Sequence, residues 1–185
     1  MKIIGFYGSP RPQSNSRALV DTVLAAAGEQ GADTEVFDLN ALDIKGCTAC
    51  FACHKTPEAF CVQKDDMDQI YAAVKAADAI VIGTPIYMAQ ASAQTILLLN
   101  RLYALMYATD TGASAFKIGP KKVVMIYAQG APMADHYNTY FDINDGAFAM
   151  MLNGEIVKRI VCAKEFSDEE LADAREIGHR LACGL

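Results

Sequence analysis

Short apolar runs alternate with longer amphipathic stretches along this chain of 185 residues. The first run, Lys2–Tyr7, ends at a Gly-Ser-Pro turn, which is typical of a buried β-strand. The stretch from about Ser14 to Glu29 carries leucines, valines and alanines on one face and predicts an amphipathic helix. Gly31 ends that helix, and the run Thr34–Leu39 predicts the second strand.

The same alternation continues to the end of the chain. Three more strands are predicted, at Ala79–Gly83, Lys122–Ala128 and Ile156–Cys162. The first of these is apolar throughout, so we expect it to be buried on both sides. Four more helices are predicted: one begins at Asp65 or Asp66, one covers about Ala91–Tyr107, one lies somewhere within Asp135–Leu152, and one follows a capping box formed by Ser167 and Glu170.

Repeated strand–helix alternation predicts a parallel sheet with helices packed on both of its faces. The length is that of one domain, so we expect residues 1–185 to form a single unit. Sheets of this kind bind ligands beyond the carboxyl ends of their strands, where the strand order reverses. A ligand site is therefore expected in the loops that follow the first four strands.

Composition narrows the possible classes of function. Apolar residues make up 52% of the chain and charged residues 21%, which is typical of a folded globular protein. The net charge is −6 with no block of Lys or Arg, so nucleic-acid binding has no electrostatic basis. The longest apolar stretch, Ile96–Ala108, is interrupted by Asn100 and Arg101, and the first apolar run is too short for a signal peptide. We expect a cytoplasmic protein that binds neither nucleic acid nor membrane.

The loop after the first strand is dense in small hydrogen-bonding side chains and runs directly into a helix. It reads Gly8-Ser9-Pro10-Arg11-Pro12-Gln13-Ser14-Asn15-Ser16-Arg17. A helix N-terminus offers free N–H groups, and serine hydroxyls with an arginine add donors at the same point, which suits a phosphate monoester. A plain turn with an N-cap would need only Ser14 or Asn15 and would leave Ser9, Arg11 and Ser16 without a role.

The loops after the third and fourth strands carry a second set of candidates. Pro85 stiffens the first of these turns, so that the apolar residues after it are presented at the strand end. An ordinary proline turn with partly buried apolar residues is the simpler alternative. Gly130 allows the backbone of the other loop to approach a flat ligand closely. The candidate residues at these two strand ends are Pro85, Ile86, Tyr87, Met88, Gln129 and Gly130.

A long segment at about residues 40–64, the cysteine loop, separates the second strand from its helix and far exceeds a usual connection. It holds four of the six cysteines in the pattern C-x2-C-x2-C-x7-C, namely Cys47, Cys50, Cys53 and Cys61. Three cysteines at this spacing resemble the start of a ferredoxin motif that binds a [4Fe–4S] cluster. The alternatives are a zinc site, a redox-active Cys-x-x-Cys pair, or small buried residues without a cofactor.

These segments together resemble one protein family. Gly-Ser-Pro-Arg followed by Ser-Asn-Ser is similar to the FMN-phosphate loop of the flavodoxin-like NAD(P)H:FMN reductases and the related iron–sulfur flavoproteins. Thr-Pro-Ile-Tyr resembles the family's segment that packs on the isoalloxazine ring, and the cysteine pattern resembles the cluster motif of the iron–sulfur flavoproteins. The resemblance extends from Met1 to about Cys162. It implies that the FMN phosphate is surrounded by Ser9, Arg11, Ser14, Asn15 and Ser16.

The resemblance also implies an architecture and a chemistry. The fold should be flavodoxin-like, a five-stranded parallel sheet in the order 2-1-3-4-5 with helices on both faces. The activity should be that of an FMN-dependent oxidoreductase of the iron–sulfur flavoprotein type, with a [4Fe–4S] cluster and with NAD(P)H, another small molecule or a ferredoxin-type protein as electron donor or acceptor. A cluster-free NAD(P)H-dependent FMN or quinone reductase and a non-enzymatic, zinc-stabilised binding module stay open as alternatives. FMN carries the reaction, so no side chain is expected to act as acid or base.

The helix predicted over about Ala91–Tyr107 raises two further points. Its segment Ile96–Tyr107 is apolar nearly all round, whereas a surface helix has a polar side, so we expect a subunit interface in a homodimer or homotetramer. A deeply buried helix would give the same pattern. Thr95 and Asn100-Arg101 also stand where the family often carries a lysine and an Asp-Arg pair.

Overall fold

Five parallel strands form the central sheet of the computed structural model, which describes residues 1–185. Their order is β2-β1-β3-β7-β8, so the chain builds one edge of the sheet first and then crosses to the other. Counted among the parallel strands alone, this order is 2-1-3-4-5, which confirms the predicted flavodoxin-like architecture. The strands are β1 (Lys2–Tyr7), β2 (Asp33–Asp38), β3 (Ala79–Tyr87), β7 (Lys121–Gln129) and β8 (Gly154–Ala163).

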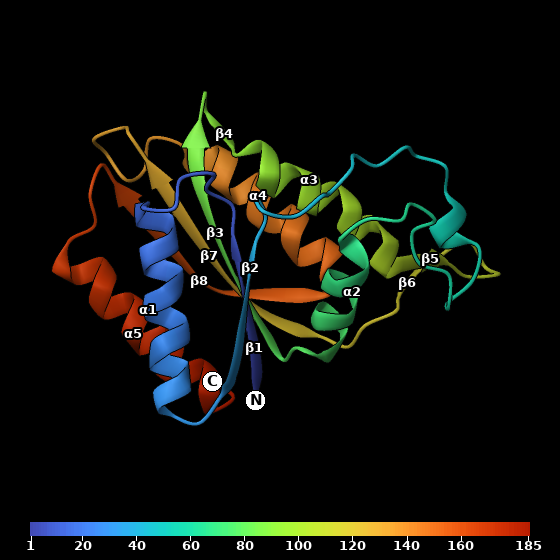
Figure 1. Cartoon of the computed structure of the whole chain (residues 1–185), viewed down its shortest axis with the longest axis horizontal. Coiled ribbons are helices and arrows are strands. Elements are labelled where there is room, and N and C mark those ends of the chain that lie inside the picture. Colours follow the sequence, from blue (N-terminus) through green and yellow to red (C-terminus); the bar gives the residue numbers. More distant parts are fainter.

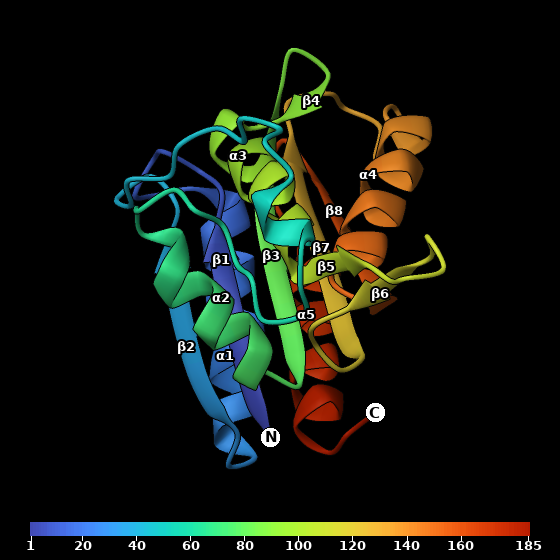
Figure 2. The same cartoon turned by 90° about the vertical axis from the view of Figure 1, so that its right-hand side faces the viewer.

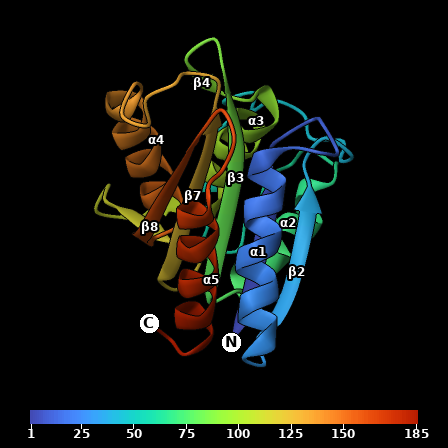
Figure 3. The ribbon, with the colours of Figure 1, turned by 90° about the vertical axis from the view of Figure 1, so that its left-hand side faces the viewer.

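Helices cover both faces of the sheet (Figure 1). One face is covered by α1 (Asn15–Glu29) and α5 (Asp168–Ala182), which pack side by side (Figure 3). The other face is covered by α2 (Met67–Ala76), α3 (Ala93–Leu102) and α4 (Asn138–Met151) (Figure 2). None of these helices combines the length and the apolar character that crossing a membrane requires.

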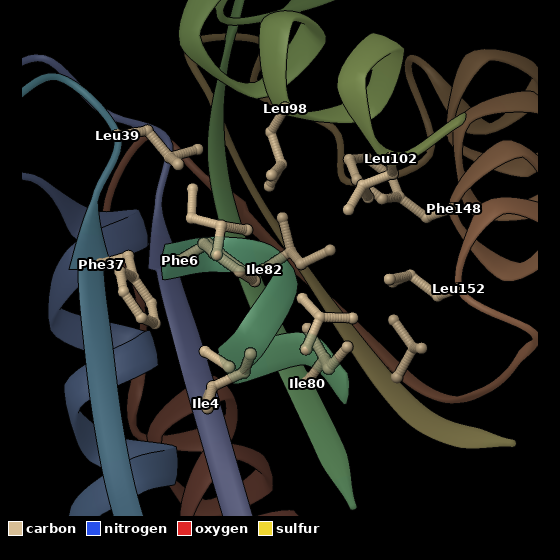
Figure 4. Close-up of a cluster of buried hydrophobic side chains, with 14 of the residues drawn as sticks. Ile4, Phe6, Phe37, Leu39, Ile80, Ile82, Leu98, Leu102, Phe148 and Leu152 are labelled. Carbon is tan, nitrogen blue, oxygen red and sulfur yellow. The ribbon is translucent and has the colours of Figure 1, made fainter. Parts of the chain in front are cut away.

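The strands feed two apolar cores because successive side chains point to opposite faces of a strand. Ile3 of β1 belongs to the core beneath α1 and α5, whereas its neighbour Ile4 belongs to the core beneath α2, α3 and α4. In Figure 4, Ile82 of β3 lies in this second core, opposite Leu98 and Leu102 of α3. All of β3 before its last residue is buried, as its unbroken apolar run predicted.

The first departure from the predicted elements is at the end of β3. The strand continues past Gly83 to Tyr87 and turns back into β4 (Gln90–Ala91) as a short antiparallel hairpin. Met88 and Ala89 form the turn, with positive φ angles of 49° and 63°. Such angles match the twist of a two-residue hairpin, but residues other than glycine, asparagine and aspartate rarely adopt them. The residue types Met88 and Ala89 therefore do not predict this turn.

The second departure corrects the helix predicted over about Ala91–Tyr107. α3 ends at Leu102, and a 3-10 turn leads into β5 (Met106–Ala108), which pairs with β6 (Ser114–Phe116). Leu105 is buried at the end of this 3-10 turn and not on the face of α3. The apolar run continues without a break across the end of the helix, so hydrophobic periodicity did not reveal where the helix stops.

Gly178 marks a close approach of α5 to α1, and its replacement tests that packing. A Cβ atom at this position would lie 2.8 Å from Cβ of Ala26 and would collide with the carbonyl oxygen of Val23. We expect Gly178→Ala to lower the free energy of unfolding by about 1–3 kcal/mol, the usual cost of overpacking.

The matched control is Gly146→Ala, in the middle of α4. A Cβ atom there meets no neighbouring atom, so the change should raise stability by up to ~1 kcal/mol through helix propensity. Urea denaturation measures both variants. Equal stability of Gly178→Ala and the wild type would contradict the close packing of α1 and α5.

Candidate functional site

A pocket of about 310 Å³ opens where the carboxyl ends of β1, β3 and β7 meet. It is the site expected for a sheet whose strand order reverses between β1 and β3. Nine residues predicted to bind a cofactor line it together, namely Arg11, Ser14, Asn15, Ser16, Pro85, Ile86, Tyr87, Gln129 and Gly130. Ala128 and Lys164 complete the lining.

The other two predicted residues, Ser9 and Met88, lie outside this lining. Ser9 is fully buried: its Oγ accepts a hydrogen bond from the N–H of Arg11 (3.2 Å), and its carbonyl accepts one from the guanidinium of Arg17 (2.8 Å). Met88 is 95% exposed in the turn between β3 and β4. Ser9 therefore supports the loop from inside, while Met88 belongs to an exposed turn.

The wall of the pocket at the start of α1 is rich in hydrogen-bond donors. Ser14 is the N-cap of α1, and its Oγ accepts a hydrogen bond from the N–H of Arg17 (3.4 Å). The Oγ atoms of Ser14 and Ser16 lie 3.4 Å apart. Arg11 is exposed beside them. The N-terminal end of a helix carries partial positive charge and free N–H groups, so this wall suits an anion.

Lys164 is a lining residue that sequence reasoning missed. It follows β8 with a φ angle of 67°, and its carbonyl accepts a hydrogen bond from Nδ2 of Asn15 (2.7 Å). The same amide nitrogen lies 3.5 Å from Sγ of Cys162. Asn15 thus joins the start of α1 to the end of β8. The rule that ligands bind at the carboxyl ends of strands would have found Lys164 if the loop after the fifth parallel strand had been included.

Arg17 holds the loop after β1 in place. Its guanidinium binds the carbonyl of Ser9 and the carboxylate of Asp38 (2.7 Å), and it lies 4.7 Å from the ring centre of Tyr7. The Tyr7 hydroxyl donates a hydrogen bond to Asp21 of α1. Burial, and then this carboxylate, raise the pKa of Tyr7. The loop is therefore fixed by contacts within the protein, and Arg17 is already engaged there.

Gln129 presents an unsatisfied acceptor next to the pocket. Its side chain is buried, and Nε2 donates a hydrogen bond to the carbonyl of Met133 (2.6 Å). Its Oε1 is buried without a partner. An unpaired buried oxygen costs free energy, so an N–H donor that reached this atom would be stabilising.

Three buried hydroxyls join the loops after β1 and β3. Ser92 Oγ donates a hydrogen bond to the carbonyl of Gly8 (2.6 Å) and lies 3.0 Å from Thr95 Oγ1, which donates to Thr84 Oγ1 (3.0 Å). The N–H of Gly8 donates to the carbonyl of Gly83 (2.7 Å). A Cβ atom on Gly8 would collide with the Thr95 hydroxyl, so only glycine lets the loops come this close. The network fixes the separation of two walls of the pocket.

The four cysteines of the cysteine loop line a second pocket of about 140 Å³. All four are free thiols; Cys47 and Cys50 are exposed, whereas Cys53 and Cys61 are half-buried. Phe51, with a φ angle of 56°, lines the same pocket. No three His, Cys, Asp or Glu side chains of the chain converge closely enough to hold a single metal ion.

The thiols of this second pocket differ in their surroundings. A hydrogen bond from the backbone of Ala52, together with smaller contributions, lowers the pKa of Cys50. Burial raises the pKa of Cys53, against the opposing effect of the Lys117 ammonium. Nζ of Lys117 donates hydrogen bonds to the carbonyls of Cys53 (2.6 Å) and Ala104 (2.9 Å). At Cys53 burial outweighs the cation, so the thiolate, the form that binds metals, is disfavoured there, whereas it is favoured at Cys50.

The hydroxyl network predicts the effect of an isosteric change at Thr95. Thr95→Val removes one hydroxyl and leaves buried polar groups of Ser92 and Thr84 without a partner. We expect a loss of about 1–3 kcal/mol in the free energy of unfolding. Thr34→Val, on the exposed edge strand β2, is the matched control and should change stability by less than ~0.5 kcal/mol. Thermal unfolding compares the two; a Thr95→Val protein as stable as the control would contradict the network.

Comparisons with known proteins point to one family. Residues 1–151 match the family model described as NADPH-dependent FMN reductase. An iron-sulfur flavoprotein of Methanocaldococcus jannaschii is 40% identical over 101 residues, which are 55% of this chain and 51% of that protein. One of Archaeoglobus fulgidus is 29% identical over 182 residues, 98% of this chain and 79% of that protein. The chain spans about half the length of several curated relatives that it matches.

Solved structures share the fold at low sequence identity. An NAD(P)H:quinone oxidoreductase from Methanothermobacter marburgensis superposes with a TM-score of 0.76 at 17% identity, and the match covers 98% of each chain. A flavone reductase gives a TM-score of 0.73 at 22% identity and covers 100% of this chain and 62% of that one. Since the family model matches most of the chain and the fold extends over nearly all of it, the protein belongs to the NADPH-dependent FMN reductase family.

Proposed function

We propose that this protein is an FMN-dependent oxidoreductase of the iron–sulfur flavoprotein type. The observation that carries the proposal is the pocket at the carboxyl edge of the sheet, where donors suited to a phosphate and surfaces suited to a flat ring line one cavity. Membership of the NADPH-dependent FMN reductase family supports the cofactor. The iron-sulfur flavoproteins among the relatives support a role for the cysteine pocket.

The N-terminal end of α1 would hold the phosphate of FMN. Arg11 supplies a planar guanidinium that donates paired hydrogen bonds to phosphate oxygens, and Lys164 adds a second positive charge from the loop after β8. The hydroxyls of Ser14 and Ser16 and the free N–H groups of the helix start add neutral donors. In a chain of net charge −6, these side chains make the pocket locally favourable for an anion.

The ends of β3 and β7 would hold the isoalloxazine ring of FMN. Pro85, Ile86 and Tyr87 form the wall from β3, and Gln129 and Gly130 form the wall from β7. The buried Oε1 of Gln129 would accept an N–H from the ring edge, which removes the cost of its isolation. Bound FMN supplies the redox chemistry; the protein orients it and sets the polarity around it.

The cysteine pocket would hold a [4Fe–4S] cluster through Cys47, Cys50, Cys53 and Cys61. Such a cluster takes one thiolate at each iron, so its ligands stand around a cavity. A zinc ion needs its thiolates to converge to about 2.3 Å from one point. The four cysteines line one cavity, and the iron-sulfur flavoproteins among the relatives favour the cluster over the zinc-stabilised module.

The electron donor is proposed to be NAD(P)H or a ferredoxin-type protein. A cluster-free NAD(P)H-dependent FMN or quinone reductase is the second candidate. It is supported by the match of residues 1–151 to the NADPH-dependent FMN reductase family model. The two candidates differ in whether the cysteine pocket is needed for electron transfer.

Self-association and a cytoplasmic location stay predictions. Leu98 and Leu102, which suggested an apolar outer face on α3, are buried within the chain. Ile96, Leu97 and Leu99 of the same helix are half-buried. These three residues are the large apolar side chains of α3 that stay partly exposed and that a subunit contact could use.

Arg11→Ala separates recognition of the phosphate from recognition of the ring. FMN carries a phosphate and riboflavin does not, so FMN binding should weaken by roughly tenfold or more while riboflavin binding changes little. Arg175→Ala, which removes an exposed arginine from α5, is the matched control. Fluorescence titration of the flavin-free proteins measures the dissociation constants. An unchanged constant for FMN would show that the phosphate binds elsewhere.

Cys50→Ala tests the cluster. With three thiolates left, the iron content of anaerobically purified protein should fall sharply, because one iron loses its ligand. FMN content should stay at the wild-type level, since no residue of the larger pocket changes. Cys183→Ala, an exposed cysteine outside the cysteine loop, is the matched control and should keep both cofactors. Iron analysis and absorption spectra measure the outcome.

One result would remove the cluster from the proposal. Wild-type protein that is free of iron after anaerobic purification, and that nevertheless oxidises NAD(P)H at the rate of the Cys50→Ala variant, would leave the cluster-free reductase as the function.

A further inference from the structure

The base of the cysteine loop is closed by hydrogen bonds between its two ends. The N–H of Lys45 donates to the carboxylate of Asp65 (3.1 Å), and the N–H of Asp43 donates to the carboxylate of Asp66 (2.7 Å). In return, the N–H of Asp66 donates to the carbonyl of Asp43 (3.1 Å). The chain therefore leaves and re-enters the body of the protein at one point.

Arg101 of α3 binds both of these ends at once. Its Nη1 donates a hydrogen bond to the carbonyl of Lys45 (2.8 Å), and its guanidinium forms a two-pronged ion pair with Asp65, in which Nη2 and Oδ1 lie 3.1 Å apart. Asp65 also accepts from the N–H of Met67 at the start of α2 (3.1 Å). One pair of side chains thus connects α2, α3 and both ends of the loop.

This ion pair is removed from water. The Arg101 and Asp65 side chains are 1% and 0% exposed, and Nε of Arg101 has no hydrogen-bond partner. Burial opposes ionisation of Asp65, but hydrogen bonds from Arg101, Lys45 and Met67 outweigh it and lower the pKa of this carboxyl. The pair is therefore charged as well as buried.

Core stability alone does not explain a buried ion pair. Withdrawing two charges from water costs free energy, and well-packed apolar residues in their place often leave a protein equally stable or more stable. An apolar pair could not, however, bind the carbonyl and the N–H of Lys45. What the ion pair adds to simple packing is a fixed position for the backbone at the ends of the loop.

The fixed positions border the predicted metal ligands. Lys45 precedes Cys47 by two residues, and Asp65 follows Cys61 by four. The pair therefore limits how far the first and last cysteines of the motif can move apart. The larger pocket lies at the other end of α3: Ser92, the N-cap of that helix, is hydrogen-bonded to the loop after β1, whereas Arg101 is near the end of the helix.

We propose that Arg101 and Asp65 are positioning residues of the cysteine site, which hold the ends of the loop in the arrangement that a cluster requires without touching the metal. The part of this inference that concerns metal binding rests on the proposed function. Ordering the loop in advance removes a conformational entropy cost that cluster binding would otherwise have to overcome. FMN binding should not depend on the pair, because neither residue lines the larger pocket.

The experiment uses the full chain with both partners replaced, Asp65→Leu together with Arg101→Met. A single replacement would leave a buried charge unpaired and would destabilise the whole fold. After reconstitution with iron and sulfide, we expect iron occupancy to fall by roughly tenfold or more. In the iron-free protein, trypsin cleavage after the exposed Lys55 should become roughly tenfold faster, and the dissociation constant for FMN should stay unchanged.

A partly exposed ion pair outside the cysteine loop provides the control. Arg159 of β8 binds Asp145 of α4, with Nη2 and Oδ2 2.7 Å apart, outside the cysteine loop. Arg159→Met together with Asp145→Asn removes that ion pair while leaving an acceptor for the Tyr127 hydroxyl. This variant should keep wild-type iron occupancy and wild-type cleavage after Lys55.

Two results would overturn the inference. One is iron occupancy and cleavage in the Asp65→Leu, Arg101→Met protein equal to those of the wild type. The other is loss of FMN binding together with iron, because the pair would then support the fold as a whole. If the wild type itself takes up no iron, the proposed cluster fails. Faster cleavage after Lys55 in the iron-free variant than in the wild type would then still support the positioning role. An equal cleavage rate in the two proteins would overturn it.

Discussion

The fold depends on the parallel pairing of β1 with β3, which leaves β2 on one side of β1 and every later parallel strand on the other. Because the connections run toward opposite edges, α1 and α2 cover opposite faces of the sheet (Figure 1). The hydrogen bond from Gly8 to Gly83 keeps the loops after these two strands together. The larger pocket lies at this point, so its position follows from strand order and not from any one side chain.

α3 relates the two pockets to each other. At its start, Ser92 and Thr95 bond the loops that line the larger pocket; near its end, Arg101 binds both ends of the cysteine loop. Its middle is apolar, and Leu98 is buried in the core. The burial of the middle stabilises the helix, while its polar ends fix two loops, of which only the cysteine loop contains a short 3-10 turn, Ala52–His54. A helix of this length spans about 15 Å, so it also sets the spacing between the two sites.

The strands, their order and most of the pocket could be predicted because each depends on local patterns and on one topological rule. Lys164 was missed because the loop after the last strand was left out of that rule. The turn at Met88 and Ala89 was missed because neither residue signals a tight hairpin. The ion pair of Asp65 with Arg101 joins residues 36 positions apart, and no periodicity or spacing in a sequence reports such a contact.

The central claim is that one chain holds FMN at the carboxyl edge of the sheet and a cluster in the cysteine loop. The most direct test is the absorption spectrum of anaerobically purified wild-type protein, together with chemical analysis of its flavin and iron. We predict flavin bands superimposed on broad iron–sulfur absorption, with one FMN and one [4Fe–4S] cluster per chain. A protein that lacks either flavin or iron, and that does not take up the missing cofactor on reconstitution, would contradict the claim.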